Sequence, residues 1–289
     1  MNNNSPQSNF AYAFKRNRVI PLLSQCLLIV ASAVVVTPLV FVFFTSLKDN
    51  QEFFVNIFGP PSIYRWNNYA IAWVTGKLGS YFFNSIFVTV MAVVFTIVLV
   101  IPGGYALAKL HIPKSNLIIL VLMTFTFIPG IAIYISLYTM MSSARMTGNL
   151  FTMIMPYTAW SIPFSMYIIK QYFEIIPMEL VESGRIDGCS EFQTFIHIMV
   201  PLIVPAVATI VVFNFIGNWG ELMWANIATA ASRTIKTLPV GLLNFKSEMG
   251  VQWGYYCAGI CLVTVPLMVV FVYFQKYFVA GLTNGAVKG

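Results

Sequence analysis

The chain has 289 residues and a formal net charge of +7, yet only 9% of its residues are charged and 58% are hydrophobic. Its mean hydropathy is +0.80. Because a soluble domain carries about 25% charged residues, this composition excludes a protein surrounded by water and indicates one embedded in lipid. No basic run is longer than two residues, so the positive charge does not indicate nucleic-acid binding.

Six apolar stretches follow one another along the chain, each long enough for the roughly 20 residues that a spanning helix needs. Backbone groups in lipid must be hydrogen-bonded within their own segment, so each stretch is expected to be a helix. The first is too long for a signal peptide. The sequence predicts an all-α integral membrane protein, with one transmembrane domain over 19–281 and spans at about 19–47, 82–108, 116–141, 150–173, 201–226 and 254–278.

Positive charges near the first span set the predicted orientation, because basic residues favour the cytoplasmic side of a membrane. Lys15, Arg16 and Arg18 directly precede that span. The N-terminal segment 1–18 is therefore expected in the cytoplasm. An even number of spans returns the C-terminal tail 282–289 to the same side, so both termini are predicted to be cytoplasmic.

The loop at 174–200, also predicted to be cytoplasmic, is rich in acidic side chains. Four of the nine acidic residues lie close together in it. Pro177 suits the first turn of a helix, where its missing N–H is not needed, and Gly188 allows a turn without a steric clash. We expect a short helix, a turn and a second helix that leads into the fifth span at Pro201. The alternative is a loop that only anchors in headgroups, but anionic headgroups would repel its acid.

No catalytic or metal-binding constellation stands out in the sequence. The phosphate-binding pattern G-x-x-x-x-G-K-[ST] does not occur, so the chain is not expected to bind and hydrolyse ATP by that route. His111 and His197 stand alone, without partners at metal-ligand spacing. We therefore expect this chain to bind no cofactor and no metal.

The charged loop carries an acid, a glycine, an isoleucine and a proline at fixed spacing. The pattern reads Glu182, five residues, Gly188, nine residues, Ile198, two residues, Pro201. It resembles the EAA loop of binding-protein-dependent ABC importers, with Ser183 and Gly184 in place of the two alanines usual there. The resemblance implies that the loop is a coupling helix for ATPase subunits and points to Glu179, Glu182, Ser183, Gly184, Asp187, Gly188, Ile198 and Pro201.

The resemblance extends over most of the chain and is closest to the permeases of carbohydrate importers, in particular the second membrane subunit of the maltose-transporter type. Six further motifs carry it, in the family's order: Asn84-Ser85, Tyr105-Ala106-Leu107-Ala108, Ile128-Pro129, Trp219-Gly220-Glu221-Leu222-x-Trp224, Thr237-Leu238-Pro239-Val240-Gly241 and the C-terminal stretch from Gly281 to Gly289. The implied fold is that of a type I ABC importer permease, with the coupling loop between spans four and five.

The resemblance also implies an assembly and a location. The chain would be half of a membrane heterodimer with a second permease subunit. Two ATP-binding subunits would hold ATP and Mg, and an extracytoplasmic solute-binding protein would dock on the outer side. The protein would be located in the bacterial inner membrane. The implied function is passage of a sugar, expected to be an oligosaccharide, driven by ATP hydrolysis in the partner subunits.

Aromatic and amide side chains within the spans are candidates for sugar contacts, because aromatic faces stack on sugar rings and amides bond hydroxyl groups. The alternative for each of these side chains is a structural role, in helix packing or at the membrane–water interface. Asn214, Asn218 and Glu221 recur at spacings of four and three, which predicts one polar helical face that lines the path or the seam to the partner. The candidates are Tyr134, Trp160, Asn214, Asn218, Trp219, Glu221 and Trp224.

Three other functions remain open at this stage. An ion-coupled secondary sugar transporter needs ionisable groups near the membrane centre, and Glu221 is the one candidate in the spans. An ion channel needs a polar filter or charged rings, and the sequence shows neither. A permease of the same type could also carry a solute that is not a sugar.

Overall fold

The computed structural model describes residues 19–232, 234–247 and 250–286. Lys15, Arg16 and Arg18 lie outside the described residues, as do positions 287–289 of the predicted tail. Five helices of 16 residues or more make up most of the chain. They are α2 (Val19–Ser46), α5 (Leu78–Lys109), α8 (Phe151–Ile175), α12 (Val204–Trp219) and α15 (Trp253–Ala286).

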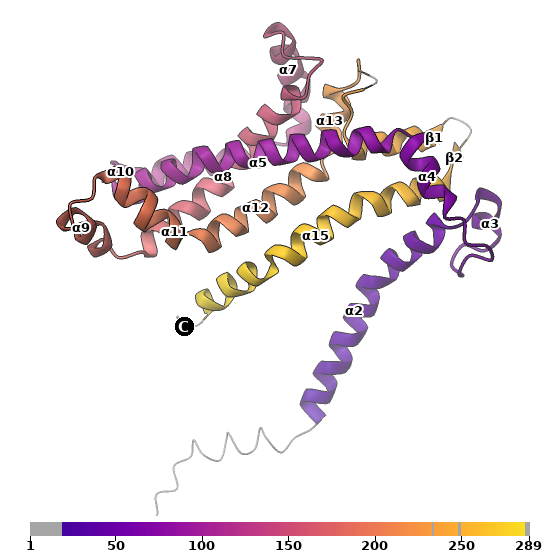
Figure 1. Cartoon of the computed structure of the whole chain (residues 1–289), viewed down its shortest axis with the longest axis horizontal. Coiled ribbons are helices and arrows are strands. Elements are labelled where there is room, and N and C mark those ends of the chain that lie inside the picture. The colour runs from indigo at the N-terminus through magenta and orange to yellow at the C-terminus, as the bar shows by residue number, and fades with distance from the viewer. Residues whose placement is uncertain (1–18, 233, 248–249, 287–289) are drawn as a thin grey trace, which may run out of the picture.

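Helices α5, α8, α12 and α15 run alongside one another, and α2 leaves this bundle at an angle and contacts α15 (Figure 1). Three helices are long and apolar enough to cross a membrane within the described residues, or up to five if each of two bent pairs is one span. Helix α8 is long enough, but its hydroxyl-bearing side chains and prolines leave it less apolar than these three helices. The predicted count of six spans is therefore not confirmed, although the all-α membrane architecture is.

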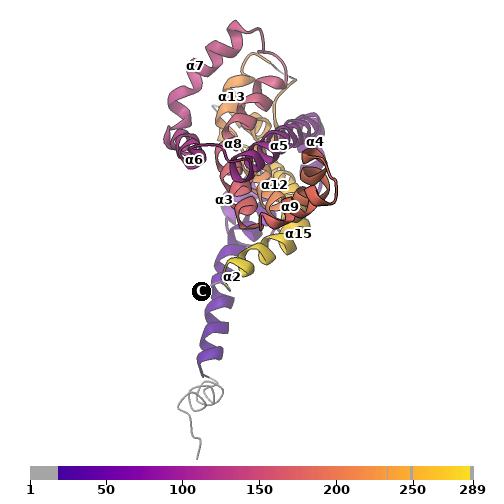
Figure 2. The same ribbon diagram turned by 90° about the vertical axis from the view of Figure 1, so that its left-hand side faces the viewer.

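The third predicted span, 116–141, is not one helix. Helix α6 (Ser115–Thr124) and the 3₁₀ turn η1 (Phe125–Phe127) meet α7 (Gly130–Ser143) at 96°, and α7 projects to one side of the bundle (Figure 2). Pro129 lies at this bend. The residue before a proline is pushed out of the helical region, and Ile128 has φ −74° and ψ 120°. The prediction of a continuous helix is wrong at this point.

The fifth predicted span, 201–226, is also divided. The helical segment that leads into it consists of α10 (Glu191–Gln193), the π-helical segment η2 (Thr194–Met199) and α11 (Val200–Leu202). This segment meets α12 at 69°, with Ile203 between them. At the other end α12 stops at Trp219, and the short α13 (Met223–Ala228) follows after Gly220. The sixth span is longer than predicted, because α15 continues to Ala286.

Short elements gather at the end of the bundle away from α10 (Figure 1). They are α3 (Asn50–Val55), α4 (Asn67–Val74), α14 (Leu238–Gly241), η3 (Leu242–Phe245) and the antiparallel pair β1 (Lys246–Ser247) and β2 (Gly250–Val251). Lys48 is fully buried here and donates from Nζ to the carbonyls of Asn56 and Ile57. Burial lowers the pKa of the Lys48 ammonium. The ammonium thus satisfies two carbonyls that follow α3.

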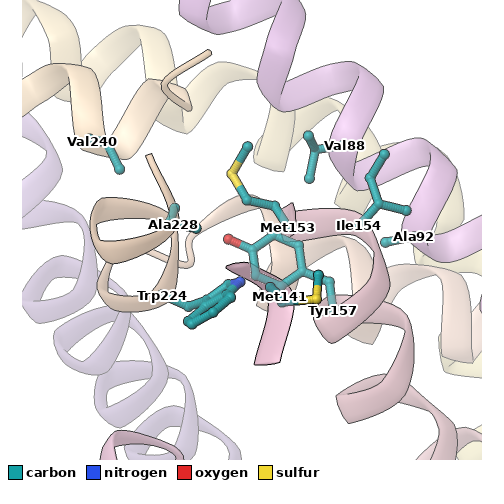
Figure 3. Close-up of a cluster of buried hydrophobic side chains, with 10 residues drawn as sticks. Val88, Ala92, Met141, Met153, Ile154, Tyr157, Trp224, Ala228 and Val240 are labelled. Carbon is teal, nitrogen blue, oxygen red and sulfur yellow. The ribbon is translucent and has the colours of Figure 1, made fainter. Parts of the chain in front are cut away.

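Helices α5 and α8 form the closest pair of the bundle. A Cβ at Gly103 would lie 2.7 Å from Met166 Cε, and one at Gly104 would lie 2.5 Å from Ile169 Cγ2. Small residues allow membrane helices to approach closely. A cluster of buried side chains packs around Tyr157 (Figure 3). Its members come from α5, α7, α8, α13 and α14. This cluster holds the projecting α7 and the short α13 against the bundle.

Candidate functional site

The charged loop folds as predicted into a helix, a turn and a second helix. Helix α9 (Glu179–Ile186) begins two residues after Pro177, and its first turn contains two acids, which the positive end of a helix dipole favours. Gly188 has φ +82°, a conformation that glycine adopts without strain. The N–H groups of Gly188 and Cys189 donate to the carbonyls of Arg185 and Gly184, at 3.1 and 2.9 Å. These two bonds form a Schellman motif that ends α9.

Gly184 packs against the second helix of the loop. It is buried, and a Cβ there would lie 2.9 Å from Ile198 Cδ1 and 3.0 Å from Thr194 Oγ1. Two residues of the fixed-spacing pattern, Gly184 and Ile198, thus meet across the turn. The missing Cβ allows α9 to lie close to the segment 194–199.

A capping box begins the second helix. The Ser190 hydroxyl accepts from the N–H of Gln193, and the Gln193 side chain accepts from the N–H of Ser190. Arg185 Nε lies 2.6 Å from Glu191 Oε1, which ties α9 to α10 across the turn. This hydrogen bond raises the pKa of Arg185 and lowers the pKa of Glu191. Both side chains are about half exposed, so the pair adds little stability.

The outer face of α9 combines acidic and apolar side chains. Glu179, Glu182 and Ser183 are exposed, and Ile186 is 85% exposed. Phe192, just after the turn, is 72% exposed. Large apolar side chains in water together with acids are typical of a surface that a partner protein covers.

Two residues of the pattern have no visible contact role. Pro201 lies within α11 and is exposed. Asp187 caps α9 with its backbone, but in the described part of the chain its carboxylate has no hydrogen bond or ion pair. The turn that follows Asp187 is closed by backbone hydrogen bonds.

Two of the seven substrate-path candidates line one cavity. The rings of Tyr134 and Trp160 lie 5.8 Å apart, on the wall of a cavity of about 410 Å³. Phe125, Thr126 and Gly130 border the same cavity, at the break between α6 and α7. In transporters, substrate sites are often formed where a membrane helix is interrupted. The break that the sequence analysis missed therefore coincides with a candidate sugar site.

The other two tryptophans among the substrate-path candidates, Trp219 and Trp224, belong to the core. Trp219 donates from Nε1 to the Val263 carbonyl at 2.9 Å, and Trp224 donates to the Thr152 carbonyl at 3.0 Å. Both are at least 99% buried, and Trp224 faces Tyr157 in the cluster of Figure 3. Their structural positions match the alternative of helix packing.

The predicted polar face of Asn214, Asn218 and Glu221 does not exist as one helical face, because α12 ends at Trp219. Asn214 is buried and donates to Ser165 Oγ at 3.0 Å. Asn218 Nδ2 is buried without a hydrogen-bond partner in the described chain.

Glu221 lies beyond the helix and accepts from the N–H groups of Trp224 and Ala225 and from the Tyr157 hydroxyl. Its carboxylate therefore caps α13. A helix N-terminus favours a negative charge, which explains an acid at this place without a transport role.

Two buried lysines at the end of the bundle near α9 escaped the sequence analysis. Lys170 donates from Nζ to Asn116 Oδ1 at 2.7 Å and pairs with Glu174. Lys109 donates to the Ile176 carbonyl at 2.6 Å. In the sequence, both lysines could be noticed because they lie in the last turns of apolar spans. A lysine at such a place is equally expected when its side chain only reaches toward the lipid headgroups.

Comparison with known proteins places residues 100–284 in the family model "Binding-protein-dependent transport system inner membrane component". A diacetylchitobiose uptake system permease, DasC of Streptomyces coelicolor, is 30% identical over 94% of this chain and 98% of its own length. An arabinooligosaccharides transport system permease, AraQ of Halalkalibacterium halodurans, is 29% identical over 95% of this chain and 100% of its own.

Among solved structures, a chain of a bacterial ABC transporter that imports the acidic polysaccharide alginate is similar in fold. Its TM-score is 0.74 at 23% identity, and the match covers 91% of this chain and 97% of that one.

Proposed function

The chain belongs to the inner membrane components of binding-protein-dependent transport systems, and from this we propose that it forms half of the path of an ATP-driven sugar importer. The family match begins in the last turns of α5 and extends into α15. Members of the family are permease subunits of ABC transporters and are not themselves enzymes. They are multi-pass proteins of the inner membrane that work with another permease, ATPase subunits and a solute-binding protein.

An oligosaccharide is the substrate that the comparisons and the cavity favour. The two relatives named above carry oligosaccharides by their descriptions. The cavity at the break between α6 and α7 offers the rings of Tyr134 and Trp160. Aromatic rings of this kind present large apolar faces beside a polar group, as sugar rings require.

The exposed face of α9 is the observation that supports coupling to ATPase subunits. The Schellman turn at Gly188 and the close contact at Gly184 hold this face at the end of the bundle. In the proposed assembly two ATPase subunits, which hold ATP and Mg, contact α9 and its counterpart in a second, different permease. Both termini then lie on the cytoplasmic side with α9, and this chain binds no cofactor of its own.

The substrate class is tested with the complete complex in lipid nanodiscs, by ATP hydrolysis in the presence of the solute-binding protein. We expect hydrolysis to rise when that protein is loaded with an oligosaccharide from a panel of mono- and oligosaccharides, and not with amino acids or inorganic ions. Stimulation by a solute other than a sugar, with no response to any carbohydrate, would contradict the proposed substrate.

A further inference from the structure

The segment that joins α8 to α9 carries a backbone carbonyl with an unusual partner. Helix α8 ends at Ile175, and Ile176 is extended because Pro177 follows it. Pro177 has no N–H to donate to a helical carbonyl, and α8 ends before it. The Ile176 carbonyl accepts from Lys109 Nζ at 2.6 Å, across 67 positions of the sequence.

Lys109 reaches this carbonyl from another helix. It is the last residue of α5 and is only 8% exposed. The carboxylates of Glu174 and Glu179, on either side of the joining segment, carry the opposite charge, but neither forms an ion pair with Lys109 among the described residues. A buried charge is costly unless it is hydrogen-bonded, and the bond to the Ile176 carbonyl holds the ammonium in place.

The bond lies where a close helix pair meets the coupling loop. Helices α5 and α8 touch at Gly103 and Gly104, one to two turns before Lys109. Beyond the bond, Met178 and Val181 pack into the same apolar cluster as Tyr105 and Phe173. Along the backbone, a displacement of α9 reaches α8 through Ile176 and Pro177, beside these apolar contacts.

We propose that Lys109 is a positioning residue for coupling. Its ammonium joins the end of α5 to the segment between α8 and α9, so that α9, α8 and α5 move as one body when the ATPase subunits act. Without the bond, this segment bends at Pro177 and part of the displacement of α9 is lost before it reaches the helices. This inference rests on the proposed function, because it assigns a role within the coupling of ATP hydrolysis to transport.

The test is the amount of sugar transported per ATP hydrolysed, measured on the reconstituted complex with Lys109→Met. Methionine keeps most of the length and the apolar contacts of lysine but cannot donate a hydrogen bond. We expect an intact complex that still hydrolyses ATP, with a transport-to-hydrolysis ratio lowered about tenfold, which corresponds to about 1.4 kcal/mol. Lys109→Arg, which can still donate to the carbonyl, is expected to restore the ratio.

Lys114→Met is the matched control. It removes the same charge from an exposed side chain five positions away and is expected to leave the ratio unchanged. An unchanged ratio in Lys109→Met would overturn the proposal, and so would loss of the assembled complex in that variant, which would assign Lys109 to stability alone. If the wild-type complex itself fails to couple ATP to sugar uptake, the proposed function fails instead.

Discussion

At the scale of single residues, Gly188 has a defined conformational role. Its φ of +82° ends α9, and the space around a Cβ at this position is open. A substitution there is therefore disfavoured by backbone conformation and not by contact with neighbours. A left-handed conformation costs an ordinary L-residue about 1–2 kcal/mol, and a β-branched residue more.

We predict that Gly188→Val abolishes transport while the protein still inserts into the membrane, because the turn presents α9 to the ATPase subunits. Gly188→Asn is the matched control, since asparagine tolerates a positive φ, and it should retain most of the uptake. Uptake assays together with quantification of the membrane-inserted protein check both variants. Equal transport by the valine and asparagine variants would show that this conformation is not needed.

Changing the charge of Glu182 tests whether the exposed face of α9 contacts the ATPase subunits. The Glu182 carboxylate is exposed and forms no ion pair within the part of the chain that the structure describes, so a substitution should leave the fold intact. We predict that Glu182→Lys releases the ATPase subunits or separates hydrolysis from uptake, since a charge-assisted contact is worth about 1.5–3 kcal/mol. Co-purification of the ATPase subunits measures the first effect. Glu182→Gln should be milder, and normal transport by Glu182→Lys would remove this residue from the coupling contact.

At the scale of elements, the coupling loop could be predicted and the broken spans could not. Pro177 and Gly188 mark the two ends of α9 by local chemistry that operates in any fold. Ile128-Pro129 was visible in the sequence too, but a proline within an apolar run is compatible with a kinked helix or with a full break. Tertiary packing of α7 against α13 and α8 decides between them here.

The aromatic candidates show the same limit. Spacing does not tell which face of a helix a tryptophan occupies. Trp219 and Trp224 therefore looked equal to Trp160 in the sequence, whereas only Trp160 reaches the cavity at the break. Glu221 was assigned to the fifth span because no apolar signal marks the end of α12 at Gly220.

The accessibility of introduced cysteines shows whether α12 lines the translocation path or the interface with the partner permease. We replace Asn218 or Asn214 by cysteine in a background without the native Cys26, Cys189, Cys257 and Cys261. Asn218 is half-buried, and its amide nitrogen has no hydrogen-bond partner among the described residues, whereas Asn214 donates to Ser165 inside the chain. If Asn218 lines the path, a water-soluble thiol reagent labels Asn218→Cys at a rate that changes with ATP and loaded binding protein.

Asn214→Cys is the internal control and should stay protected in every state. Protection of Asn218→Cys in every state, with cross-linking to the partner permease, would assign Asn218 to the seam between the subunits. Labelling of both positions at equal rates would contradict the packing of Asn214 against α8.

At the scale of the whole molecule, the chain has the surfaces expected of one subunit of a larger complex. The end with α9 exposes acid and apolar side chains. In the described part of α2, the most apolar window has no buried residue, and Thr45 and Ser46 at the end of this helix are buried. The described residues bury three apolar clusters along the bundle, so the bundle has its own core. Its coupling face and its cavity have a purpose only when partner subunits supply ATP hydrolysis and deliver a solute.

Uptake of a labelled oligosaccharide into proteoliposomes tests this account most directly. The vesicles contain this chain with its partner permease and ATPase subunits, loaded binding protein is added outside, and an ionophore collapses all ion gradients. The account predicts uptake that requires hydrolysable ATP inside and continues without any gradient. Uptake that follows a proton or sodium gradient and is indifferent to ATP would contradict it and identify an ion-coupled transporter.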